Sequence, residues 1–126
     1  MDDTTPLDPL AQVAALVQQG FVARLWIFPV TDDRLRRDVQ QIDGIPISPD
    51  AVAVSALRSL LTHVLDGAAE AVVVIERPAG PRPTPDDWAW HDVIRRAAGG
   101  VPVALRGVLL AHRDGVDPLE PRTLAA

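Results

Sequence analysis

One stretch, residues 71–87, constrains the fold of this 126-residue chain more than any other. It opens with the wholly apolar run Ala71–Ile75, continues through a proline-rich turn, and leads directly into a predicted helix. A strand that is exposed on one face alternates apolar and polar residues, and this run does not alternate. We therefore predict that residues 71–75 form a central strand that is covered on both faces.

The end of the proline-rich turn carries a helix-start signal. Thr84 is a predicted N-cap, Pro85 fits the first turn because its missing N–H needs no partner there, and Asp87 stands at the capping-box position. Gly99 and Gly100 end the helix. Its apolar positions share one face: Trp90, Val93, Ile94 and Ala97.

The remaining sequence predicts further elements around this unit. Helices are predicted over residues 9–19, between Asp8 as N-cap and Gly20, and over residues 49–65, which Ser48 caps. Strands are predicted over residues 21–30, 34–42 and 45–47 and, as one bent strand or two, over 101–105 and 107–111. This order favours one α+β domain over residues 1–126, an α/β/α-like sandwich in which about three helices cover a mixed sheet. Residues 1–7 and 119–126 are predicted to be loose tails.

Composition excludes several classes of function. The absence of cysteine excludes disulfides, thiolate zinc sites and cysteine nucleophiles. The sequence contains no nucleophile elbow, no P-loop and no dinucleotide-binding motif. A net charge of −5 offers no general attraction for nucleic acid.

No apolar run approaches the roughly 20 residues that span a bilayer, and the acidic N-terminus lacks a signal-peptide start, so we expect a cytoplasmic protein without membrane contact.

The turn after Ile75 resembles the zinc-binding loop of RadC-type JAB/MPN metalloprotease domains. That loop reads His-x-His-Pro-Ser-Gly-(Asp)-Pro-Thr-Pro; here Pro78–Ala79–Gly80 and Pro83–Thr84–Pro85 keep the frame, with one residue inserted. Residues 49–52 (PDAV) are similar to the family's Pro-Arg-Glu-Val helix start, and residues 100–103 (GVPV) to its Gly-Ile-Pro-Leu closing strand. The resemblance covers residues 22–118 and implies a JAB/MPN-like mixed sheet with helices on its faces.

The same resemblance implies a zinc ion held by two histidines and an aspartate, with a glutamate that activates the bound water. Ile75 and Arg77 stand where the histidines belong. An aliphatic group cannot ligate, and a guanidinium repels a divalent cation. We therefore predict no catalytic residue, no metal and no cofactor. The expected function is a non-catalytic binding or scaffolding module with a protein partner or a second copy, because metal-free JAB/MPN members typically pair with a partner protein.

Two alternatives stay open. A divergent metal-dependent hydrolase would use Asp38, Glu76, Asp87 or a histidine in a rearranged site, although no two histidines stand at a spacing that presents them together. A DNA-repair-associated accessory protein would use the basic cluster at residues 34–37. Because the total charge is acidic, we expect nucleic-acid binding to be disfavoured.

Five candidate binding residues gather around the loop and the helix that follows it: Arg77, Arg82, Asp87, Trp88 and His91. The helix N-terminus attracts anions, but its own acidic residues already occupy that role, so an internal Arg–Asp clamp is favoured over an anion site. Trp88 is predicted on the outer side of the helix near His91. It is either an exposed interface anchor or a side chain folded onto the neighbouring prolines.

Overall fold

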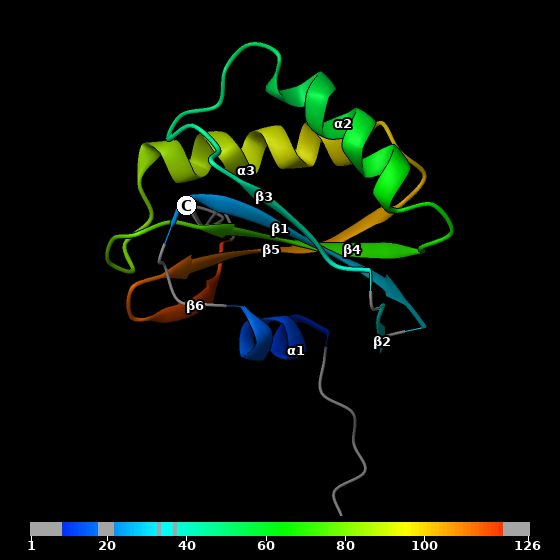
Figure 1. The fold of residues 1–126 in the computed structure, drawn as a ribbon, viewed down its shortest axis with the longest axis horizontal. Coiled ribbons are helices and arrows are strands. Elements are labelled where there is room, and N and C mark those ends of the chain that lie inside the picture. The colour runs from blue at the N-terminus through cyan, green and yellow to red at the C-terminus, as the bar shows by residue number, and fades with distance from the viewer. Residues whose placement is uncertain (1–8, 18–21, 33, 37, 120–126) are drawn as a thin grey trace, which may run out of the picture.

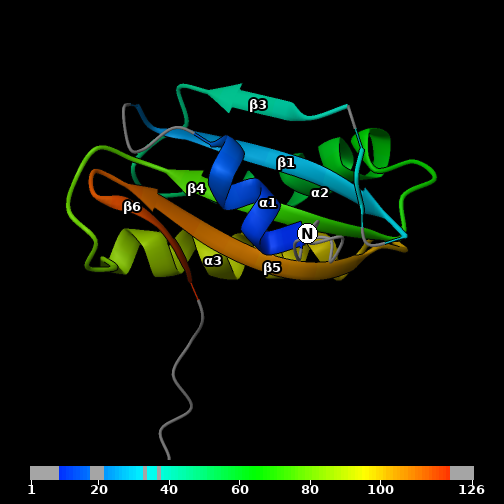
Figure 2. The ribbon, with the colours of Figure 1, turned by 90° about the horizontal axis from the view of Figure 1, so that it is seen from below.

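The computed structural model describes residues 9–17, 22–32, 34–36 and 38–119. The helices are α1 (Pro9–Leu16), α2 (Ala53–Val64) and α3 (Pro85–Ala98). The strands are β1 (Arg24–Thr31), β2 (Arg34–Leu35), β3 (Gln40–Asp43), β4 (Glu70–Glu76), β5 (Ala104–His112) and β6 (Gly115–Pro118). Figures 1 and 2 show α2 and α3 on one face of the sheet and α1 on the other. The predicted α+β fold is therefore confirmed.

The sheet is mixed and has β4 at its centre. Its strand order is β2-β1-β4-β5-β6, and β3 pairs with β1 beside β2. β1 is antiparallel to β4, whereas β4 and β5 are parallel. Each residue of Ala71–Ile75 is at most 2% exposed, which confirms the predicted central strand.

Alternation along β4 divides the core into two layers. Val73 and Ile75 belong to the larger cluster beneath α2 and α3, and Val72 and Val74 belong to the smaller cluster beneath α1. Because successive side chains of a strand point to opposite faces, Glu76 falls on the α1 side. The next residue, Arg77, falls on the side of α3.

Of the three predicted N-caps, Asp8 lies outside the described residues, and the other two have different outcomes. The capping box of α3 is confirmed: Thr84 Oγ1 accepts a hydrogen bond from the Asp87 N–H at 3.2 Å, and Asp87 Oδ2 accepts from the Thr84 N–H at 2.8 Å. The predicted start of α2 at Ser48 is wrong, because this helix begins at Ala53 and has no side-chain cap. The Ser48 hydroxyl instead donates to the Asp86 carboxylate at the start of α3.

Several predicted strands also differ from the structure. The strand predicted over 34–42 is divided into β2 and β3, and the one over 101–111 is a single strand that begins at Ala104. The strand predicted over 45–47 is wrong, because Pro46 and Pro49 supply no N–H to a ladder and residues 44–52 form an irregular segment. β6 was not predicted, and Leu119 is 1% exposed rather than part of a loose tail. Residues 1–8 and Gly20 lie outside the described residues.

Replacing Gly67 by alanine should lower the free energy of unfolding by about 1 kcal/mol. Gly67 follows the end of α2 with φ +80°, a left-handed conformation that strains any residue with a Cβ. Gly80→Ala is the matched control, because its φ is not left-handed and an added Cβ would meet no atom within 4 Å. Urea denaturation of both variants measures the difference, and equal losses would contradict the assignment.

Candidate functional site

A crevice of about 410 Å³ lies where β4 ends and α3 begins. Its polar wall carries Arg77, Thr84, Asp86 and Asp87, and its apolar wall carries Ile75, Pro78, Trp90 and residues 45–47. The crevice therefore coincides with the turn whose sequence resembles a JAB/MPN zinc loop. Its lining combines the end of β4, the loop that follows, the start of α3 and the distant residues 45–47, which makes it the leading candidate site.

The Arg77 guanidinium fills the polar end of this crevice as the centre of a clamp. It donates from Nε to Asp87 Oδ1 at 3.0 Å and from Nη2 to Asp87 Oδ2 at 2.8 Å. Its Nη1 donates to the Gly80 carbonyl at 2.8 Å, and Nη2 also donates to the Arg82 carbonyl at 3.0 Å. The side chains of Arg77 and Asp87 are only 14% and 5% exposed. The predicted internal Arg–Asp clamp is therefore present.

This clamp changes what Asp87 can do chemically. Both carboxylate oxygens accept hydrogen bonds from Arg77, and Oδ2 also accepts from the Thr84 N–H. A metal ion at Asp87 would have to displace these donors and would lie beside a guanidinium charge. The geometry suits the carboxylate to holding the loop on α3 rather than to ligation.

Glu76, which immediately precedes Arg77, belongs to a different environment. Its side chain is fully buried, and Oε1 accepts a hydrogen bond from Trp26 Nε1 at 2.9 Å. The Nε of Arg24 lies 3.4 Å from the same oxygen. Trp26 belongs to the cluster beneath α1, so the Glu76 carboxylate and the Arg77–Asp87 pair lie on opposite faces of the sheet. Glu76 and Asp87 both border the crevice, but their carboxylates lie on opposite faces of the sheet and do not converge.

The other candidate ligands are equally dispersed. Asp38 pairs with Arg36 at 2.7 Å, and Arg36 also contacts the Asp66 carbonyl, near the opposite end of β4 from Arg77. His63 is exposed on α2, whereas His112 is buried at the end of β5 and bonds Asp117. Within the described part of the chain, no three His, Cys, Asp or Glu residues gather closely enough to hold a metal ion.

The structure separates the three remaining candidate binding residues. Arg82 is exposed and contributes its carbonyl to the clamp. Trp88 is half-buried, packs against the larger core cluster, and contacts His91 edge-on with ring centroids 5.5 Å apart. His91 is only 8% exposed. Trp88 is therefore neither a fully exposed anchor nor part of the crevice wall.

Part of the apolar wall comes from residues 45–47, which were predicted as a strand and not as a binding site. Trp90 Nε1 donates to the carbonyls of Pro46 and Ile47, both at 3.1 Å, and so holds this segment across the start of α3. The Ile47 side chain is left 76% exposed. An adjoining hollow of about 230 Å³ extends the apolar surface along α2 to Val52, which is 63% exposed. The only sign of this exposed surface in the sequence was the position of Ile47 between two prolines, Pro46 and Pro49.

The basic cluster of residues 34–37 is partly neutralised. Arg36 is paired with Asp38, Arg34 is exposed, and Arg37 lies outside the described residues. Arg24, a potential extension of the cluster, is engaged by Asp43 and Glu76. Two of the three described arginines of this region therefore have carboxylate partners, which weakens their attraction for a phosphate backbone.

Two comparisons of this sequence with known proteins found no match. No protein-family model matches it, and a search of the curated proteins finds no match. The JAB/MPN resemblance accordingly remains a prediction from the loop and its flanking motifs. None of the described helices combines the length and the apolar composition that crossing a bilayer requires.

Proposed function

We propose that this domain is a non-catalytic, JAB/MPN-like binding or scaffolding module that contacts a partner protein or a second copy of itself. The contact surface is the crevice at the start of α3 together with the apolar segment that closes it. The partner inserts an apolar side chain beside Ile47, and its polar groups meet the rim formed by the Arg77–Pro85 loop.

The observation that carries this proposal is the Arg77–Asp87 pair in the crevice. The pair uses the Asp87 carboxylate of that wall in a structural role, and Asp86 accepts from the Ser48 hydroxyl. The opposite wall presents Ile47 and Pro46 to solvent. Exposed apolar surface beside a rigid polar rim is the usual composition of a protein interface. The clamp also holds the loop in one conformation, which lowers the entropy cost of binding.

Replacing Ile47 by aspartate should weaken partner binding by about tenfold or more, because it places a charge at the centre of an apolar contact. Cross-linking in cells of the source organism, followed by mass spectrometry, identifies what the wild-type domain contacts. Titration of the purified partner, or sedimentation for self-association, then gives the affinity of each variant.

Leu16→Asp is the matched control, since Leu16 is 61% exposed on α1 at the opposite face of the sheet. Its affinity should equal that of the wild type. The proposal would be overturned if the partner bound Ile47→Asp as tightly as the wild type. It would also be overturned if only Leu16→Asp abolished binding, because the interface would then lie elsewhere.

A further inference from the structure

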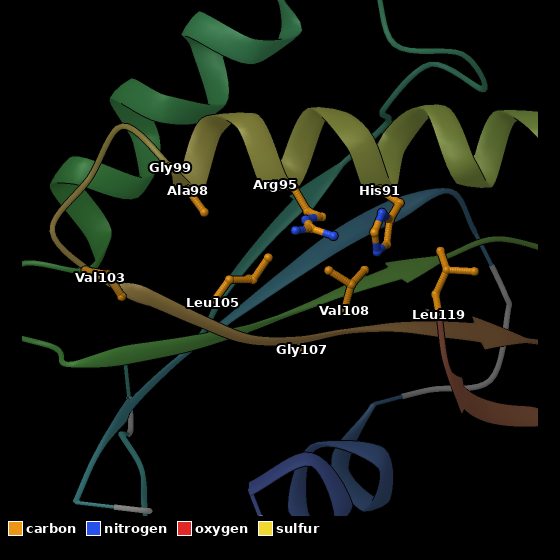
Figure 3. Close-up of a pocket in the computed structure, with 9 residues that line it drawn as sticks. All are labelled: His91, Arg95, Ala98, Gly99, Val103, Leu105, Gly107, Val108 and Leu119. Atoms are coloured by element: carbon orange, nitrogen blue, oxygen red, sulfur yellow. The ribbon is translucent and has the colours of Figure 1, made fainter. Parts of the chain in front are cut away.

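A second cavity, of about 340 Å³, lies between α3 and β5 and shares no residue with the crevice. Its apolar lining consists of Ala98, Val103, Leu105, Val108 and Leu119. Figure 3 shows the side chains of His91 and Arg95 directed from α3 toward β5, on the helix side of this cavity. Its size lies at the lower end of the range for small-molecule pockets.

The cavity owes its space to an irregularity in β5. The pairing with β4 shifts from Ala71–Leu105 to Val72–Gly107, so one extra residue is accommodated in the strand. Leu105 and Val108, which both pack in the cluster beneath α3, are therefore three positions apart instead of two. A Cβ added to Gly107 would point at Leu10 of α1, on the other face. Gly107 therefore sends no side chain into the cavity, and the described part of β5 lines it with Leu105 and Val108.

Arg95 supplies a permanent positive charge at this cavity. Arg95 forms no ion pair with any described carboxylate, whereas the adjacent Arg96 pairs with Asp92 at 3.0 Å. No acidic side chain among the described residues lines the cavity. Arg95, an exposed residue, thus places a guanidinium with its forked donors at the edge of a hollow that is apolar on its β5 side.

We propose that this cavity binds a small amphipathic carboxylate. The carboxylate accepts the charge-assisted, bidentate hydrogen bonds that a guanidinium favours. The apolar body of the ligand lies against Val103, Leu105 and Val108, in the space opened by the bulge. The proposal does not depend on the protein-binding function, because the two hollows are lined by different residues.

The test is a titration of the isotope-labelled domain with octanoate, in which NMR measures the change in amide chemical shifts. Saturable shifts should be confined to residues around Arg95 and Val108. Acetate lacks the apolar chain and 1-octanol lacks the charge, so each should bind at least about tenfold more weakly than octanoate. Arg95→Gln should weaken octanoate binding by about tenfold, and Arg96→Gln should leave it unchanged.

Two further variants keep the test decisive. Arg95→Lys retains the charge but not the forked donors, so its affinity should lie between those of the wild type and Arg95→Gln. Leu105→Trp fills the hollow and should abolish binding. Ile47→Asp should not affect octanoate, which separates this site from the proposed protein interface. Equal affinity for octanoate and 1-octanol, undiminished binding by Arg95→Gln, or no saturable shift near the cavity would overturn the proposal.

Discussion

Replacing Asp87 by alanine should lower the free energy of unfolding by about 3–5 kcal/mol. The substitution leaves the Arg77 guanidinium, only 14% exposed, without its carboxylate. It also removes one half of the capping box of α3, because the Thr84 N–H loses its acceptor. Chemical denaturation, monitored by tryptophan fluorescence and by circular dichroism, measures the loss.

Asp92→Ala is the matched control for this variant. Asp92 lies on the same helix and also pairs with an arginine, but its side chain is 58% exposed. Its removal should cost about 0.5 kcal/mol or less. A double-mutant cycle with Arg77→Ala isolates the pair, and a coupling energy near zero would show that the clamp does not stabilise the fold.

Replacing Glu76 by alanine should lower the free energy of unfolding by about 3 kcal/mol. The fully buried carboxylate accepts from the Trp26 indole and from the Val22 N–H, so its removal leaves two donors without their acceptor. It also takes away one of the two carboxylates beside Arg24, which keeps Asp43. Glu76→Gln keeps an acceptor for Trp26 but loses the charge opposite Arg24. We expect it to lose about half as much stability, measured by the same denaturation experiment.

Glu70→Ala provides the comparison at the other end of β4. Glu70 pairs with Arg106 at 2.9 Å, and its side chain is 32% exposed, so its loss should cost about 1 kcal/mol or less. If Glu76→Ala were no more destabilising than Glu70→Ala, the buried carboxylate would not be part of the structural core that we describe.

The features predicted correctly from the sequence are those that neighbouring residues determine. The capping box depends on Thr84 and Asp87, three positions apart, and the central strand follows from an uninterrupted apolar run. The Arg77–Asp87 clamp was also predicted. A turn that leads from a strand directly into a helix brings the end of the strand close to the start of the helix, so Arg77 can reach Asp87.

The features that were missed depend on contacts between distant parts of the chain. Residues 44–52 are held by the Trp90 indole and by Asp86, more than 35 positions away, which no local pattern reveals. The half-buried position of Trp88 and the burial of His91 follow from packing of α3 on the sheet. Likewise, the hollow beside Arg95 arises from a bulge in β5.

One feature of the candidate site was predictable but was not predicted. Strand alternation alone places Ile75 and Arg77 on one face and Glu76 on the other, so a site that combines Glu76 with Asp87 was already disfavoured by the sequence. The structure adds the partners that make each position stable, the Trp26 indole for Glu76 and the guanidinium for Asp87.

The metal content of the purified, untagged domain tests most directly whether the Arg77 guanidinium, rather than a cation, accompanies Asp87. The protein would be expressed in zinc-supplemented medium, dialysed against metal-free buffer, and analysed by inductively coupled plasma mass spectrometry, with Asp87→Ala in parallel. We predict that both proteins retain only a small fraction of one zinc per chain. One zinc per wild-type chain that resists dialysis and is absent from Asp87→Ala would contradict the account.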